Sequence, residues 1–268
     1  MWYYDDSIVV MSDYEKILQN DLKKALLRKE LFLCYQPMVS MRSRKIYQVE
    51  ALLRWRHPVR GLLNPMEFIP MAEKTKQIIP IGNWVLENAC CQLKEWHDMG
   101  FTQMRLSVNI SVIQLEQVDF ICNIRNILDK YNLLAEYLEF EVTETGCMNF
   151  TEIVTENLRV LSKEGIRISM DDFGTGYNSL KNLQQFTVNN IKLDRTFISR
   201  INDSINRSII DTIISLGHEL GMRIVAEGIE DEEQYRYLLS RNCDFGQGYY
   251  FCEPILPNEL IKLMKENN

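Results

Sequence analysis

The sequence lacks any apolar run that approaches the ~20 residues needed to cross a bilayer. Its N-terminus also lacks a basic region followed by a long apolar core, so we predict no signal peptide. The formal net charge of −7 shows no excess of basic residues, which disfavours polymeric nucleic acid as a partner. This balance still permits a small phosphate-bearing ligand, provided that local cations offset the acids.

Cysteine and histidine patterns typical of metal or disulfide sites are missing too. The seven cysteines are an odd number without a C-x-x-C pair, and the three histidines are scattered, so we predict no zinc site. We interpret the cysteines as buried, reduced thiols of a cytoplasmic protein, whose full-length form could be anchored to a membrane through upstream segments. The chain contains no dinucleotide-binding G-x-G-x-x-G motif, no P-loop and no low-complexity segment.

The chain does contain a regular alternation of β-like and helix-like segments. Strands are predicted at residues 31–36, 46–53, 104–110, 137–142, 166–172, 189–193, 222–227 and 245–251. Helices are predicted near residues 66–75, 80–99, 112–131, 150–164, 178–186, 204–220, 231–241 and 257–266. This order favours an α/β fold, a (β/α)8 barrel rather than an open doubly wound sheet, and 268 residues match the ~250 of such a barrel.

Residues 1–28 stand apart from this alternation. Ser12 and Glu15 have the spacing of a helix capping box, and an apolar helical stripe follows them. We predict that residues 1–28 form a linker helix that comes from a preceding domain. The barrel domain is predicted to span residues 29–268.

Polar residues end most of the predicted strands. They are Glu50, Asn109, Glu141, Asp171, Asp172, Lys192 and Glu227. The alternation of side chains along a strand packs the apolar residues under the helices and turns the polar ones toward the barrel axis. Because the carboxyl ends of the strands meet at one mouth of such a barrel, we expect these side chains to converge there.

The carboxylates of this predicted mouth require positive charge between them. Two carboxylates ~4 Å apart repel each other by about 4 kcal/mol at an effective dielectric constant of about 20. Carboxylate and amide oxygens suit Mg²⁺ or Mn²⁺, with Ca²⁺ as a further option. The adjacent Asp171 and Asp172 favour a bridged pair of metal ions, which is the usual arrangement for cleaving phosphodiesters.

Each of these residues also has an ordinary structural interpretation. A lone Asp or Glu at a strand end is more often a helix cap or a solvated loop residue. Lys192 alone fits a surface lysine, but Asp194, which shares its strand face, indicates a buried or half-buried pair instead. The Asp-Asp-Phe-Gly-Thr-Gly segment at residues 171–176 fits either a glycine turn or a mobile loop that carries ligands. We favour the metal site because the strand ends are expected to converge.

Several segments, taken in order along the chain, form a set that resembles a known family. The set comprises Tyr35-Gln36-Pro37, Glu50-Ala51-Leu52, Phe68-Ile69-Pro70-Met71-Ala72-Glu73, Val108-Asn109-Ile110-Ser111, Glu141-Val142-Thr143-Glu144, Asp171-Asp172-Phe173-Gly174-Thr175-Gly176, Lys192-Leu193-Asp194-Arg195, Ala226-Glu227-Gly228-Ile229-Glu230 and Gln247-Gly248-Tyr249. From about Leu31 to Pro257 the chain resembles the EAL-domain cyclic di-GMP phosphodiesterases of bacteria, which are named after the Glu-Ala-Leu motif.

This resemblance implies a modified (β/α)8, TIM-like barrel with one antiparallel strand, and an EAL phosphodiesterase domain over residues 29–268. It implies metal-dependent hydrolysis of cyclic di-GMP to linear pGpG in second-messenger signalling, with two divalent ions, Mg²⁺ or Mn²⁺, as cofactors. The implied ligands of the first ion are Glu50, Asn109, Glu141 and Asp171. Asp171 and Asp172 would hold the second ion, with Glu227 close by.

The resemblance also implies roles for the remaining residues. Glu227 and Lys192 would orient or activate the attacking water. Contacts with the substrate are implied for Gln36, Arg54, Asp194, Glu230 and Gln247. Glu144 would anchor the loop that follows Asp172, and this loop with its adjoining helix would form a homodimer contact. Segments like residues 1–28 join a GGDEF domain to an EAL domain, so we expect an upstream GGDEF or sensor domain in the full-length protein.

Two rival functions remain open. A catalytically weak receptor module for cyclic di-GMP would lack some of the acids, and none is missing. An enolase-type enzyme would pair a lysine base with one or two Mg²⁺ ions to abstract a proton next to a carboxylate. The metal stoichiometry discriminates, because one Mg²⁺ per chain at saturation would count against the phosphodiesterase mechanism.

Overall fold

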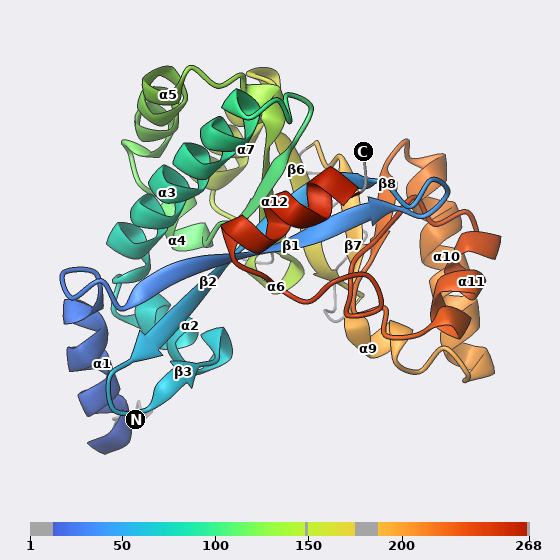
Figure 1. Cartoon of the computed structure of the whole chain (residues 1–268), viewed down its shortest axis with the longest axis horizontal. Coiled ribbons are helices and arrows are strands. Elements are labelled where there is room, and N and C mark those ends of the chain that lie inside the picture. Colours follow the sequence, from blue (N-terminus) through green and yellow to red (C-terminus); the bar gives the residue numbers. More distant parts are fainter. Residues whose placement is uncertain (1–12, 148–149, 175–186, 267–268) are drawn as a thin grey trace, which may run out of the picture.

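The computed structural model describes residues 13–147, 150–174 and 187–266. In this part of the chain, eight strands close into a barrel with helices packed on its outside (Figure 1). The strands of the ring are β1 (Leu31–Ser40), β2 (Ile46–His57), β4 (Leu106–Asn109), β5 (Leu138–Thr143), β6 (Arg167–Phe173), β7 (Asn190–Leu193), β8 (Arg223–Ala226) and β9 (Phe245–Gly246). The predicted modified (β/α)8 barrel is therefore confirmed.

The first strand of the ring, β1, runs antiparallel to both of its neighbours, β2 and β9. The other neighbouring pairs of the ring are parallel. The short strand β3 (Gly61–Leu63) pairs with the end of β2 as an antiparallel hairpin and lies outside the ring. The parallel strands therefore bring their carboxyl ends to one mouth, as the fold requires.

Helices follow most of the strands. They are α2 (Pro65–Lys74), α3 (Ile78–Asp98), α4 (Val112–Leu115), α5 (Phe120–Tyr131), α6 (Glu144–Cys147), α7 (Glu152–Lys163), α9 (Arg195–Ile198), α10 (Ser204–Glu219), α11 (Glu232–Ser240) and α12 (Pro257–Glu266), with a 3₁₀ turn at Ala135–Tyr137. Asn64 begins α2 in a capping box with Glu67, and Asp203 caps α10. Among the residues described, we find no helix of the length and apolarity needed to span a membrane.

The N-terminal helix α1 (Asp13–Ala25) packs against α2 and belongs to the same core as the barrel. Its buried stripe includes Leu18 and Leu22, and its Asp21 Oδ2 lies 3.2 Å from His57 Nε2 at the end of β2. Ser12, half of the predicted capping box, lies outside the described residues. The origin of residues 1–28 in a preceding domain stays a prediction.

The barrel has a polar interior and an apolar outer face. In β5, Phe140 is fully buried under the helices, while the inward-facing Glu139 accepts a hydrogen bond from Ser169 of β6. At the end opposite the mouth, the Tyr47 ring stacks on Phe245 at 4.3 Å between ring centroids. Strand alternation therefore separates the two faces, and this separation turns the polar strand ends toward one mouth.

Three predicted elements differ from the structure or fall outside it. The strand expected at 245–251 is only the two residues of β9. After β9 the chain turns and packs closely against the segment that follows β8. A Cβ at Gly248 would lie 2.2 Å from the Ile229 carbonyl oxygen. The helix expected at 112–131 divides into α4 and α5. The helix expected at 178–186 lies outside the described residues.

The described cysteines are free thiols. Cys34, Cys90 and Cys243 are buried, while Cys91 and Cys252 are half-buried. Cys122, on α5, is exposed, so the interpretation of the cysteines as buried is wrong for this residue.

Candidate functional site

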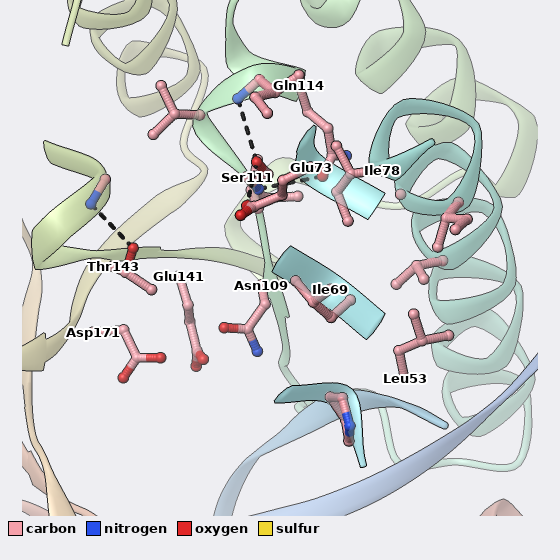
Figure 2. Close-up of a pocket in the computed structure, with 18 of the residues that line it drawn as sticks. Leu53, Ile69, Glu73, Ile78, Asn109, Ser111, Gln114, Glu141, Thr143 and Asp171 are labelled. Atoms are coloured by element: carbon pink, nitrogen blue, oxygen red, sulfur yellow. Dashed lines mark hydrogen bonds between the residues drawn. The ribbon is translucent and has the colours of Figure 1, made fainter. Parts of the chain in front are cut away.

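A cavity of ≈ 860 Å³ opens at the carboxyl ends of β2, β4, β5 and β6. The residues of its acidic wall are Glu50, Asn109, Glu141, Asp171 and Asp172. Figure 2 shows Asn109, Glu141 and Asp171 pointing into the same space. Its apolar wall includes Leu53 and Ile69, which come from β2 and α2. The cavity therefore offers both a polar surface and an apolar surface to a ligand.

Lys192 lies among the acids of this mouth and is only 1% exposed. Its Nζ lies 2.6 Å from Glu141 Oε2 and 2.6 Å from Glu227 Oε1. The same nitrogen lies 3.5 Å from Glu50 Oε2 and 3.5 Å from Asp171 Oδ1. One ammonium group thus gathers four carboxylates from β2, β5, β6 and the end of β8.

Asp171 and Asp172 are consecutive, yet both carboxylates reach this site. Regular alternation would turn them to opposite faces of β6. The ladder between β6 and β7 shifts its register between Met170 and Phe173, and Asp172 has a φ of +54°. This bulge brings ligand oxygens of Asp171, Asp172 and Glu227 within 4.8 Å of one another.

The four carboxylates carry more charge than Lys192 can offset. Burial, followed by repulsion from Glu50, raises the pKa of Glu141 well above its ordinary value. Burial also raises the pKa of Glu227 to about 8, against the attraction of Lys192. Burial would lower the pKa of Lys192, but the surrounding carboxylates outweigh this effect and raise its pKa well above the ordinary value. Further positive charge would therefore stabilise the ionised acids.

The donor set fits divalent metal ions. It consists of carboxylate and amide oxygens, which are the ligands that Mg²⁺ and Mn²⁺ prefer. Within the part of the chain that the structure describes, Glu141 Oε1 is buried without a hydrogen-bond partner, although Oε2 of the same group is bonded to Lys192. Asp171, Asp172 and Glu227 form a second group able to hold an ion. The mouth therefore brings together all the residues predicted to bind metal.

Amide side chains surround Glu50. Asn109 Nδ2 donates to Glu50 Oε1 at 2.7 Å, which leaves the Asn109 side-chain oxygen for a ligand. Gln247 Nε2 donates to Glu50 Oε2 at 2.7 Å and to Gln36 Oε1 at 3.0 Å. Gln36 in turn donates to the backbone oxygen of Cys252. Gln36 and Gln247 thus contact the acidic cluster through Glu50.

Glu144 is buried at the start of α6 and points to the loop after Asp172. Its Oε2 accepts a hydrogen bond from the backbone N–H of Gly174 at 2.8 Å. This bond holds the beginning of the segment in which the dimer contact is predicted. Residues 175–186 of that segment lie outside the described residues.

The other predicted substrate contacts lie around the cluster. Arg54 is half-buried and lines the cavity, and Glu230 is exposed in the segment after β8. Asp194 caps α9, where it accepts a hydrogen bond from Thr196 N at 2.9 Å. The ion pairs found for Lys192 in the described part of the chain do not include Asp194. The pair predicted between these two residues is therefore wrong.

Three residues without a predicted role form a hydrogen-bonded network in the cavity wall (Figure 2). Ser111 Oγ donates to Glu73 Oε1 at 2.7 Å, and Ser111 N donates to Gln114 Oε1 at 3.2 Å. Glu73 ends one of the segments that resemble the family, but this pattern does not indicate its partner. Ser111 followed by Gln114 has the spacing of a capping box, which α4 uses.

Comparison with known proteins shows which family this chain belongs to. The family model of the EAL domain matches residues 19–254. The bifunctional diguanylate cyclase/cyclic di-GMP phosphodiesterase MucR of Pseudomonas aeruginosa is 38% identical over 260 residues, which cover 97% of this chain and 38% of MucR. The cyclic di-GMP phosphodiesterase NbdA of the same organism is 35% identical over 254 residues, which cover 94% of this chain and 32% of NbdA. The chain thus spans less than half the length of these relatives.

Two solved structures are similar over most of the chain. The PaMucR phosphodiesterase in its c-di-GMP complex has a TM-score of 0.87 and 40% identity, and the match covers 91% of this chain and 99% of that chain. The EAL enzyme Bd1971 in its cAMP- and cyclic-di-GMP-bound form has a TM-score of 0.90 and 33% identity, with coverage of 94% and 69%. Both similarities support the barrel described above.

Proposed function

This chain belongs to the EAL domain family, and from that membership we propose that it hydrolyses cyclic di-GMP to linear pGpG in bacterial second-messenger signalling. MucR and NbdA are named as cyclic di-GMP phosphodiesterases, and PaMucR was solved in complex with c-di-GMP. The chain covers 99% of the solved PaMucR phosphodiesterase, so the proposal concerns the domain and not the longer relatives.

One observation carries the proposal: four carboxylates crowd one buried lysine, while Glu141 Oε1 has no hydrogen-bond partner among the described residues. We infer two divalent ions, Mg²⁺ or Mn²⁺, at this acidic wall. The first would be held by Glu50, Asn109, Glu141 and Asp171, and the second by Asp171 and Asp172 with Glu227 close by. When bound, such ions neutralise charge on phosphoryl oxygens and make a bound water a stronger nucleophile.

Lys192 and Glu227 carry opposite charges, and both would act on the attacking water. Lys192 is already the donor to Glu141 and Glu227, so it fixes the two carboxylates and supplies positive charge next to the reacting phosphate. The Glu227 side chain is 20% exposed, and one of its oxygens is bonded to Lys192. With bound cations keeping Glu227 ionised, its other oxygen would accept a proton from water at the mouth.

The two walls of the cavity suit the phosphates and the bases of a cyclic dinucleotide. Its volume of ≈ 860 Å³ lies within the range of small-molecule sites. The acidic wall would face the phosphates through bound cations, and the apolar wall around Leu53 and Ile69 would cover a planar base. Arg54 lines the same cavity and would contact a phosphate. Contacts of Gln36, Asp194, Glu230 and Gln247 with the substrate stay predictions.

We also propose that the full-length protein carries an upstream GGDEF or sensor domain. The name of MucR, which combines a diguanylate cyclase with a phosphodiesterase, supports this arrangement.

The free thiols of the described cysteines support a reducing compartment, and hence the cytoplasm. The homodimer through the loop after Asp172 stays a prediction, because that loop lies outside the described residues.

The test is to incubate the purified chain with cyclic di-GMP and Mg²⁺ and to separate the products by chromatography. We expect pGpG to accumulate, and we expect EDTA to stop the reaction. Tight binding without product over hours would instead identify a receptor. Saturation by one Mg²⁺ per chain, measured by calorimetry, would contradict the two-metal assignment and favour the enolase-type alternative.

A further inference from the structure

Glu73, at the carboxyl end of α2, reaches the segment that leaves β4 (Figure 2). This segment is Asn109-Ile110-Ser111, and Asn109 is the amide that the proposed function assigns to a metal ion. We propose that Glu73 is a positioning residue for the Asn109 side chain, acting through the Ser111 hydroxyl group. The inference rests on the proposed function, since it concerns how that metal site is held.

The position of the Asn109 side chain depends on its backbone, which pairs with Glu141 of β5. Asn109 is the last residue of β4 and is exposed in the mouth, whereas its neighbours Val108 and Ile110 are buried. Its side-chain hydrogen bond runs from Nδ2 to Glu50 Oε1, within the same acidic wall. That bond sets the rotation of the amide, but it does not set the position of the Asn109 backbone.

The residues after Asn109 are held from two sides of the mouth. On the β5 side, Ile110 N donates to the backbone oxygen of Glu141 at 2.9 Å. On the α2 side, Ser111 Oγ donates to Glu73 Oε1 at 2.7 Å. Both attachments follow directly on Asn109, the last residue of β4, so loss of the Glu73 bond leaves this segment without its bond to α2.

The Ser111 hydroxyl group uses both of its hydrogen-bonding functions. It donates to Glu73, and it accepts a hydrogen bond from Ile113 N at 3.3 Å as the N-cap of α4. Glu73 is half-buried, which protects this bond from water better than a bond between fully exposed groups. Without Glu73, the hydroxyl group would turn to another partner, and the connection between α2 and the end of β4 would be lost.

The test compares Glu73→Ala with Glu73→Gln, because glutamine keeps an oxygen that can accept the Ser111 hydrogen bond. Mn²⁺ binding is measured by electron paramagnetic resonance on chains without nucleotide, so the readout does not require hydrolysis. We expect Glu73→Ala to weaken Mn²⁺ binding by about 10- to 100-fold, as supporting residues around metal ligands do, and Glu73→Gln to restore it. Glu156→Ala, which removes an exposed acid of α7 outside the cavity, is the control.

The outcomes separate this inference from the proposed function. Equal Mn²⁺ affinity in the wild-type chain and Glu73→Ala would overturn the role of Glu73 alone. Absence of Mn²⁺ binding by the wild-type chain would overturn both. If Glu73→Ala does not fold, Ser111→Ala removes the other half of the same bond, and Mn²⁺ binding by that variant as tight as that of the wild-type chain would overturn the inference.

Discussion

Lys192 Nζ donates to Glu141 Oε2 at 2.6 Å, although their strands, β7 and β5, do not pair with each other. The two side chains meet because both point to the interior of the barrel. This bond leaves Glu141 Oε1 buried without a hydrogen-bond partner among the described residues. The ion pair therefore stabilises the acidic cluster and at the same time leaves an oxygen free for the cation that we propose.

Replacing Lys192 by methionine should destabilise the metal-free chain. The change removes the buried positive charge from four carboxylates, and breaking a buried ion pair costs about 3–5 kcal/mol. Urea unfolding in EDTA measures this loss, and added Mn²⁺ should recover part of it. Lys94→Met, which breaks the ion pair with Asp98 outside the barrel mouth, is the control, with an expected change within about 0.5 kcal/mol. Equal stability of Lys192→Met and the wild-type chain in EDTA would contradict the proposed charge balance.

Replacing Glu50 by alanine should abolish most of the hydrolysis. Glu50 is a proposed metal ligand and also accepts hydrogen bonds from Asn109 and Gln247. We expect pGpG formation to fall by at least about 100-fold, while cyclic di-GMP binding in Ca²⁺ is retained. Calorimetry and product analysis measure the two effects separately, with Glu156→Ala, at an exposed acid outside the cavity, as the control. Near-full turnover in Glu50→Ala would show that the site is assigned wrongly.

Glu144→Ala should reduce activity through the loop and not through metal binding. The variant loses the acceptor for Gly174 N–H, so the segment after Asp172 is held less firmly. We expect the Gly174 amide to exchange with solvent faster and Mn²⁺ stoichiometry to stay unchanged. Hydrogen exchange followed by NMR reports on the amide directly. An unchanged exchange rate at Gly174 would rule out this explanation.

Gly82→Ala should destabilise the cavity wall. A Cβ at this position of α3 would lie 2.0 Å from Gln114 Nε2, so the side chain that holds Ser111 N must move. We expect a loss of about 1–3 kcal/mol in the free energy of unfolding, as for other overpacked sites. In the Gln114→Ala background the same change should cost much less, because the clash is absent. Equal costs in both backgrounds would contradict the role of this contact.

The barrel and its mouth could be predicted from the sequence because both follow from local patterns. The alternation within β5 separates Glu139 and Glu141 from the apolar residues, and no distant contact is needed to see it. Asp194 shows where this reasoning stops. Strand β7 ends at Leu193, so alternation no longer applies to Asp194, which becomes the cap of α9 instead of a partner of Lys192.

Features that depend on two distant segments could not be predicted. Asp171 and Asp172 share one site because the β6–β7 ladder shifts register, and that shift is a property of the pairing and not of either strand. Glu73 and Ser111 are 38 residues apart and meet only after α3 and β4 have packed. The Glu73 carboxylate belongs to a segment that resembles the family, but its partner became evident only in the folded chain.

The most direct test of the account is the reaction of cyclic di-GMP with the purified chain and Mn²⁺ in H₂¹⁸O. We predict pGpG whose new terminal phosphate carries one ¹⁸O atom, detected by mass spectrometry, and no product when EDTA is present. This result would show that water attacks the phosphodiester at a metal-dependent site. Unchanged cyclic di-GMP after prolonged incubation with saturating Mn²⁺, or pGpG without ¹⁸O, would contradict the account.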